Sequence, residues 1–140
     1  MKGAYLLVLK NESAGELPVG KRIFYFKEGF YIYCGSAMNN LEKRVKRHFS
    51  DNKKLRWNID FITVKMMPES AILIPSEMKI ECRISGIVGR YFEAVKGFGA
   101  SDCRCVTHLY HSTLHPGVKL REILTESGFD FFRVKEEGLK

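Results

Sequence analysis

Three strand-like stretches lie close together at the start of the chain, and they constrain the fold more than any other feature. They are residues 4–9, 22–26 and 30–34, all rich in β-branched, aromatic or other large apolar side chains. The first is apolar throughout, which predicts a strand buried on both faces. Residues 11–20 contain glycine, serine and proline and predict a loop, and residues 27–29 predict a turn. Because the connections are short, the three stretches predict an antiparallel meander.

A helix is predicted directly after the third stretch. Residues 35–37 are expected to open it, with Asn39 or Asn40 as its N-cap. Apolar residues at four-residue spacing form its expected buried stripe: Leu41, Val45 and Phe49. Arg44 and His48 are also four residues apart, so they would stack on one side of this helix, next to the stripe.

The middle of the chain predicts two more strands and a second helix. The strands are expected at residues 61–66 and 71–74, and the helix is expected to start at Ser76 and Glu77. Its apolar residues give the most regular amphipathic pattern in the sequence: Ile80, Ile84, Ile87, Val88 and Tyr91. Glu81 lies one position off this stripe, at the edge of the buried face.

The C-terminal third predicts a loop, a strand, a helix closed by Gly128, and a last strand. These are expected at residues 97–102, 106–110, 118–125 and 129–134. With 140 residues and neither a repeat nor a linker, the chain predicts a single domain, 1–140. Its core would span about residues 2–91 and its C-terminal extension about 97–140. The predicted fold class is α/β of the α+β kind: a small central antiparallel sheet flanked by helices, with an added strand-helix-strand region.

Basic residues are concentrated in one segment of the sequence. They are Lys43, Arg44, Lys46, Arg47, Lys53, Lys54 and Arg56. Within this segment only Asp51 carries a negative charge. The whole chain has 23 Lys and Arg against 16 Asp and Glu, a formal net charge of +7. Such a patch attracts phosphate backbones through counterion release, so it predicts a nucleic-acid partner. The alternative is a solvated helix face followed by a basic loop.

Other features of the sequence exclude whole classes of protein. No apolar run approaches the roughly 20 residues needed to span a bilayer, and we see no signal peptide. We therefore expect a cytoplasmic protein without a membrane partner. Four cysteines, Cys34, Cys82, Cys103 and Cys105, are then expected to stay reduced. A simple nucleotide-binding enzyme is disfavoured, because the chain has neither a Walker-type loop nor a GxGxxG motif after a strand.

Residues suited to phosphodiester hydrolysis occur in a specific order. That reaction needs a positioned water, a base, a cation, and stabilisation of the leaving oxygen. The tripeptides Gly3-Ala-Tyr5 and Tyr33-Cys-Gly35 are followed by Arg44 and His48 on one helix, and by Glu81 on a later helix. In this order the chain resembles the GIY-YIG nucleases. The tripeptides correspond to the Gly-Ile-Tyr and Tyr-Ile-Gly motifs, and the resemblance covers about residues 2–91.

The whole chain is even more similar to a small prokaryotic GIY-YIG-like family, mainly archaeal, that is sometimes fused to endonuclease III-type DNA glycosylases. The matching segments are Tyr31-Ile-Tyr-Cys-Gly-Ser-Ala37, Leu41-Glu-Lys-Arg44, Trp57-Asn-Ile-Asp60, Glu81-Cys82 and Gly97-Phe-Gly-Ala-Ser-Asp-Cys103, with Cys105 and His108. Three features depart from the pattern. Residues 6–32 make the spacing between the tripeptides unusually long, and Asn58 stands where a histidine is expected. The family's late asparagine has no clear match, and Ser101 or Asp102 would have to stand in for it.

The resemblance implies a hydrolase with one divalent cation, Mg²⁺ or Mn²⁺, held by Glu81. Tyr5 or Tyr33 would help to activate the attacking water, and its pKa would have to be depressed from about 10. Arg44 would bind the scissile phosphate, and His48 would orient the site or assist proton transfer. We therefore expect a metal-dependent DNA endonuclease, in DNA repair or structure-selective cleavage. RNA remains a second possible substrate, and a catalytically inactive nucleic-acid-binding module is the alternative function.

A second cluster of residues suggests zinc, which binds thiolates and imidazoles. The cluster consists of Cys103, Cys105, His108 and His111. Cys82, on the preceding helix, could approach it in space. One alternative is that Cys103 is simply buried, with His108 and His111 on one face of a strand. Another is that Asp102 or His108 lines the same phosphate site as Glu81. A zinc-stabilised interaction domain is therefore the third functional hypothesis.

Overall fold

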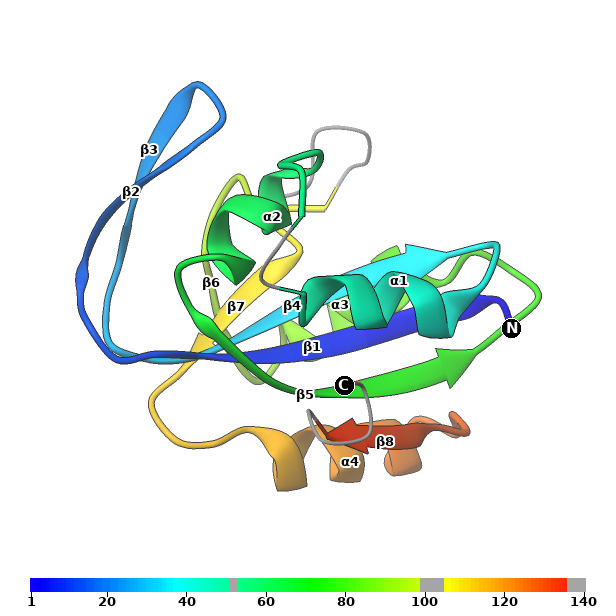
Figure 1. Cartoon of the computed structure of the whole chain (residues 1–140). Coiled ribbons are helices and arrows are strands. Elements are labelled where there is room, and N and C mark those ends of the chain that lie inside the picture. Colours follow the sequence, from blue (N-terminus) through cyan, green and yellow to red (C-terminus); the bar gives the residue numbers. More distant parts are fainter. Residues whose placement is uncertain (51–52, 99–104, 136–140) are drawn as a thin grey trace.

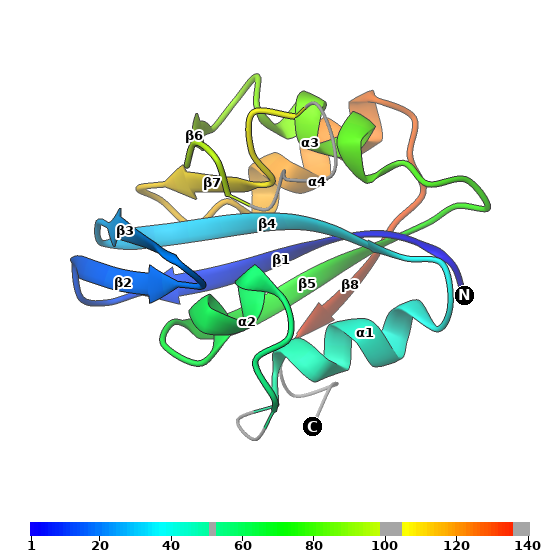
Figure 2. The ribbon, with the colours of Figure 1, turned by 90° about the horizontal axis from the view of Figure 1, so that it is seen from above.

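Strand β1 (Gly3–Asn11) runs through the middle of a six-stranded sheet (Figures 1 and 2). This computed structural model describes residues 1–50, 53–98 and 105–135. Among these residues the strand order is β6-β7-β4-β1-β5-β8, and all neighbours are antiparallel. The other strands are β4 (Gly29–Ala37), β5 (Met67–Pro75), β6 (Glu93–Ala94), β7 (Leu109–Ser112) and β8 (Phe132–Lys135). The predicted α+β class with a central antiparallel sheet is confirmed.

Helices cover both faces of this sheet, which explains why residues 4–9 of β1 are apolar throughout. Helices α1 (Leu41–His48) and α2 (Asn58–Thr63) cover one face, and α3 (Glu81–Val88) and α4 (Gly117–Glu126) cover the other (Figure 2). Because successive strand side chains point to opposite faces, β1 contributes to both cores. Tyr5, Leu7 and Leu9 pack on the side of α1 and α2, and Leu6 and Val8 on the side of α3 and α4. Each such buried leucine stabilises the fold by about 1.5–3 kcal/mol.

A hairpin of β2 (Gly15–Val19) and β3 (Arg22–Phe26) extends away from the main sheet (Figure 1). The prediction of strand 22–26 is confirmed, but the loop predicted at 11–20 was wrong, because it includes β2. The predicted meander was also wrong, because β1 pairs directly with β4. Within the described residues β2 pairs with β3 alone. This edge position tolerates the proline that favoured a loop.

The segment after β4 also differs from its prediction. Residues 35–37 do not open a helix; they continue β4 and pair with residues 3–5 of β1. Helix α1 begins at Leu41 instead. Its N-cap is Asn40, one of the two predicted caps, whose side chain accepts a 3.1 Å hydrogen bond from Lys43 N. This capping bond satisfies a backbone donor in the first turn and fixes the helix start.

Helix α2 was not predicted, and the strand predicted at 61–66 was wrong, because residues 61–63 belong to α2. Its β-branched residues favour a strand. The deciding residue is Asp60, whose carboxylate accepts hydrogen bonds from Arg56 N at 2.7 Å and Trp57 N at 2.8 Å. These bonds organise the start of the helix. The strand predicted at 71–74 is confirmed within β5.

The remaining elements are close to their predictions, with shifted ends. Helix α3 begins at Glu81 rather than at Ser76, because Ser76 Oγ accepts a 3.1 Å bond from Met78 N and forms a local turn. Strand β7 lies later than the predicted 106–110, and the two-residue β6 was not predicted. Helix α4 and strand β8 overlap their predicted ranges, and Gly128, at φ 80°, follows α4 as expected. The described part of the chain contains no helix of the length and apolarity that crossing a membrane requires.

Candidate active site

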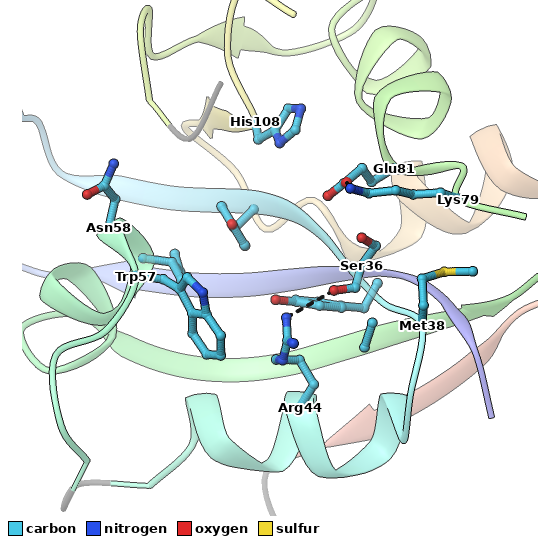
Figure 3. Close-up of a pocket in the computed structure, with 12 residues that line it drawn as sticks. Ser36, Met38, Arg44, Trp57, Asn58, Lys79, Glu81 and His108 are labelled. Atoms are coloured by element: carbon cyan, nitrogen blue, oxygen red, sulfur yellow. Dashed lines mark hydrogen bonds and ion pairs between the residues drawn. The ribbon is translucent and has the colours of Figure 1, made fainter. Parts of the chain in front are cut away.

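A pocket of about 430 Å³ opens at the edge of β4 (Figure 3). Strand β7 pairs with β4 along residues 30–33, and Cys34 N then donates to His108 O at 2.9 Å. Among the described residues, 35–37 of β4 pair only with β1, so side chains from both faces can reach this open edge. Five predicted site residues line the pocket: Tyr5, Tyr33, Arg44, Glu81 and His108. Arg44 enters it from α1, and Glu81 enters from α3.

The pairing of β1 with β4 places the two tyrosines side by side. Tyr5 pairs with Gly35 and Tyr33 pairs with Leu7, so the rings are diagonal neighbours on one face, with centroids 6.2 Å apart. Gly35 makes this possible, because a Cβ atom at this position would overlap the ring of Tyr5. The Tyr33-Cys-Gly35 motif thus supplies one pocket side chain and the space for another.

Tyr5 is bonded to His48, which lies beneath the pocket at the end of α1. The distance from Tyr5 Oη to His48 Nε2 is 2.6 Å, and both side chains are buried. Burial, reinforced by the charge of Lys53, lowers the pKa of His48 to about 3. Burial also raises the pKa of Tyr5 well above its usual value. The pair is therefore neutral at physiological pH, and the depressed pKa expected of a tyrosine base is not found at Tyr5.

Arg44 is held from two sides at the pocket's rim. Its NH1 donates to Ser36 O, at the open edge of β4, over 3.1 Å. Its Cζ lies 4.4 Å from the centroid of the Trp57 ring. A guanidinium group has five N–H donors. Arg44 can therefore keep its bond to Ser36 and still donate to a phosphate oxygen in the pocket.

Trp57 and Asp60 are site residues that the sequence reasoning did not single out, although both lie in the Trp57-Asn-Ile-Asp60 segment. Arg47 binds the fully buried carboxylate of Asp60 through two bonds, of 2.6 and 2.9 Å. Burial opposes ionisation of Asp60, but hydrogen bonds from Arg47 and the backbone lower its pKa overall. The guanidinium groups of Arg44, Arg47 and Arg56 all lie within 5.3 Å of the Trp57 ring centroid. This contact between one aromatic ring and three cations does not appear as a periodic pattern in the sequence, so the sequence alone did not reveal it.

The residues predicted to bind nucleic acid divide into two groups. Arg47 is bonded to Asp60, and Lys53 Nζ donates to His48 O at 2.8 Å and to Thr63 Oγ1 at 2.7 Å, so both stabilise the fold. The other four are exposed: Lys43, Lys46, Lys54 and Arg56. A second hollow, of about 690 Å³, is lined by Lys43, Arg44, Arg47, Arg56 and Trp57 together with Asn39 and Asn40. It shares Arg44 and Trp57 with the first pocket. We call it the basic hollow, after the lysine and arginine residues of its lining.

Glu81 is the acidic residue of the pocket lining. It lies in the first turn of α3, where the helix dipole favours a carboxylate. Its side chain is 16% exposed, and Oε1 lies 3.2 Å from Lys79 Nζ. A cation bound by Glu81 would therefore compete with Lys79 for the carboxylate.

The residues that meet in the structure differ from the cysteine–histidine cluster that the sequence predicted. Ligand atoms of Cys82, Cys105 and His108 all lie within 4.8 Å of one another and form a group that could hold a metal ion. His111 belongs elsewhere: its Nε2 lies 2.8 Å from Glu28 O, and its ring packs against Tyr31. His108 and His111 therefore do not share one face, as one alternative had assumed. The predicted positions Asp102 and Cys103 lie outside the described residues.

Comparison with known proteins identifies a family. A family model described as a domain of unknown function, DUF123, matches residues 4–127. No curated protein and no solved structure matches the chain. The matched range includes the pocket, the basic hollow and the cysteine–histidine group.

Proposed function

Because the chain belongs to the DUF123 family, whose description names no activity, we propose from the geometry of its pocket that it is a divalent-metal-dependent DNA endonuclease. The observation that carries the proposal is the meeting of Tyr5, Tyr33, Arg44 and Glu81, from four separate elements, in one pocket. They are four of the five site residues on which the resemblance to the GIY-YIG nucleases rests. A cytoplasmic location and a role in repair or structure-selective cleavage are parts of the same proposal.

The basic hollow supports nucleic acid as the substrate. It adjoins the pocket, and Lys43 and Arg56 on its lining are exposed for contact with a phosphate backbone. Trp57 offers an aromatic surface on which an unpaired base can stack, an interaction worth about 1–3 kcal/mol. A strand that crosses the hollow would pass Arg44 and enter the pocket. The hollow has no feature that distinguishes deoxyribose from ribose in the described residues, so RNA belongs in the same assays.

The pocket fits a hard divalent cation. Glu81 supplies a largely buried carboxylate, and Mg²⁺ or Mn²⁺ commonly binds through one or two carboxylates while it keeps several waters. Tyr5, Tyr33 and Ser36 add oxygen atoms to the lining. A cation held there would supply positive charge close to the scissile phosphate.

The protein's own residues supply the other requirements of hydrolysis. Arg44 would bind the phosphate and stabilise the charge that develops on it. Tyr5 and Tyr33 would orient the attacking water. Tyr5 can accept a proton from that water if it passes its own proton to His48 Nε2, to which it is already bonded. A bound phosphate would favour this transfer, because a nearby negative charge raises the pKa of an imidazole.

The second candidate function is a nucleic-acid-binding module without catalysis. The ion pair between Glu81 and Lys79 and the raised pKa of Tyr5 favour it. The two functions differ in whether Glu81 matters for cleavage or only for binding.

Nicking of supercoiled DNA in Mg²⁺ or Mn²⁺ tests the proposal. Glu81→Ala should lower nicking by at least about 100-fold, comparable to the loss of one group that stabilises the transition state. Glu77→Ala is the matched control, because this carboxylate is exposed and pairs with Lys2 away from the pocket. Equal nicking by both variants would overturn the proposal, and binding without nicking by the natural chain would favour the binding module.

A further inference from the structure

We propose that Cys82, Cys105 and His108 bind one zinc ion in the wall of the pocket. Their ligand atoms lie within 4.8 Å of one another, and Cys82 Sγ lies 3.7 Å from His108 Nε2. In a tetrahedral site, Zn–S and Zn–N bonds of about 2.3 and 2.0 Å separate the ligand atoms by about 3.5–3.8 Å. The distance from Cys82 Sγ to His108 Nε2 already lies in this range, and the other separations are at most 4.8 Å.

The fold fixes both segments that supply these ligands. Cys82 lies in the first turn of α3, and His108 immediately precedes β7. The backbone of His108 is held on both sides: its carbonyl accepts from Cys34 N at 2.9 Å, and its N–H donates to Phe98 O at 2.8 Å. Helix α3 is joined to the same segment through Ser85 Oγ, which donates to Thr107 O at 2.9 Å. These bonds bring Cys82 and His108 together without depending on an ion.

The chemistry of the ligands distinguishes this site from Glu81. Two thiolates and an imidazole select zinc over magnesium, which prefers oxygen ligands. Cys82 and Cys105 are thiols rather than a disulfide, so each can bind as a thiolate once it loses its proton. A fourth donor, such as water, would complete the tetrahedron.

The position of the site assigns it a role in shaping the pocket. Cys82 directly follows Glu81, and His108 lines the pocket itself. An ion at this position would connect the start of α3 to the segment before β7, and so would fix the carboxylate of Glu81. The inference stands on the three ligands alone and does not require that the protein cleave DNA.

Metal analysis tests the proposal. The full chain, purified with reductant but without chelators or a histidine tag, should contain about one zinc per molecule. The double variant Cys82→Ser/Cys105→Ser should contain almost none. Cys34→Ala is the matched control, because Cys34 is a buried thiol outside the group, and this variant should keep its zinc.

Cobalt substitution gives an independent readout. Co²⁺ added to the metal-free chain should give thiolate charge-transfer absorption, which the double variant should lack. If the double variant does not fold, the natural chain still decides: zinc, but not magnesium, should restore the melting temperature lost on chelation. The proposal is overturned if folded natural chain and double variant bind Zn²⁺ equally in competition with a chromophoric chelator, or if chelation and zinc leave the melting temperature unchanged.

Discussion

Tyr5 on the central strand and His48 at the end of α1 are joined by a 2.6 Å hydrogen bond between Oη and Nε2, and each is at most 2% exposed. In the part of the chain that the structure describes, His48 Nδ1 has no hydrogen-bond partner, so the bond to Tyr5 accounts for the ring's polar contacts. It also ties α1, and with it Arg44, to the strand that carries Tyr5. Stability and the shape of the pocket therefore depend on the same pair.

Removal of the Tyr5 hydroxyl should destabilise the protein. Tyr5→Phe leaves a buried imidazole nitrogen without its partner, which costs about 1–3 kcal/mol in the free energy of unfolding. Tyr33→Phe should cost less, because Tyr33 is only partly buried in the pocket. Urea denaturation of both variants measures the difference. No loss in Tyr5→Phe would show that the bond to His48 adds nothing to stability.

Stability should fall with acidity in a way that depends on His48. Its pKa is about 3 in the folded protein, against about 6.5 for an unperturbed histidine, so the unfolded chain binds a proton first as the pH falls. The contribution of His48 to the free energy of unfolding is then fully present above about pH 6.5. Below that pH it should decrease, by up to about 1.4 kcal/mol per pH unit. His48→Gln should lack this component between pH 7 and 5. A parallel pH dependence in both proteins would contradict the neutral, buried imidazole.

The ion pair of Arg47 with Asp60 should contribute far more to stability than an exposed pair. Asp60→Ala leaves a partly buried guanidinium without its carboxylate and removes the cap of α2, for a loss of about 3–5 kcal/mol. Glu77→Ala, in an exposed pair with Lys2, should change stability by no more than about 0.5 kcal/mol. Thermal and urea unfolding compare the two. Similar losses would mean that Asp60 does not organise this region.

The basic hollow should bind single-stranded DNA through two contributions, charge and stacking, and each can be measured separately. Lys43→Ala should lower the slope of log affinity against log salt by about 0.7, as expected for one lost phosphate contact on a single strand. Trp57→Ala should weaken binding by about 1–3 kcal/mol and leave the slope nearly unchanged. Fluorescence anisotropy at several salt concentrations measures both. Lys119→Ala, on α4 and outside the hollow, is the control. A loss of affinity in this control equal to that of Lys43→Ala would argue against a localised interface.

Local signals in the sequence were sufficient for the burial of β1 and for much of the pocket. The apolar run of β1 predicted its burial, and Asn40 was one of the two predicted caps of α1. The family resemblance selected five residues, of which four line one pocket and the fifth, His48, is hydrogen-bonded to Tyr5. Each of these inferences needed only neighbours in the chain or a known order of motifs.

Other features depend on partners that are distant in sequence. Helix α2 forms where local propensity favours a strand, because Asp60 caps it while Arg47 neutralises the carboxylate. The meeting of Cys82 with His108, 26 positions later, depends on how α3 packs beside the segment before β7. No spacing rule in the sequence gives these contacts.

The central claim, that this pocket cleaves DNA with a cation on Glu81, is tested most directly by cleavage and binding in one sample. A labelled branched DNA is incubated with excess protein in Mn²⁺, and bound and cleaved fractions are followed for the natural chain, Glu81→Ala and Glu77→Ala. We predict that all three bind the DNA with similar affinity, and that only Glu81→Ala loses cleavage, by at least about 100-fold. Cleavage by Glu81→Ala at the rate of the natural chain, or binding without cleavage by all three, would contradict the claim.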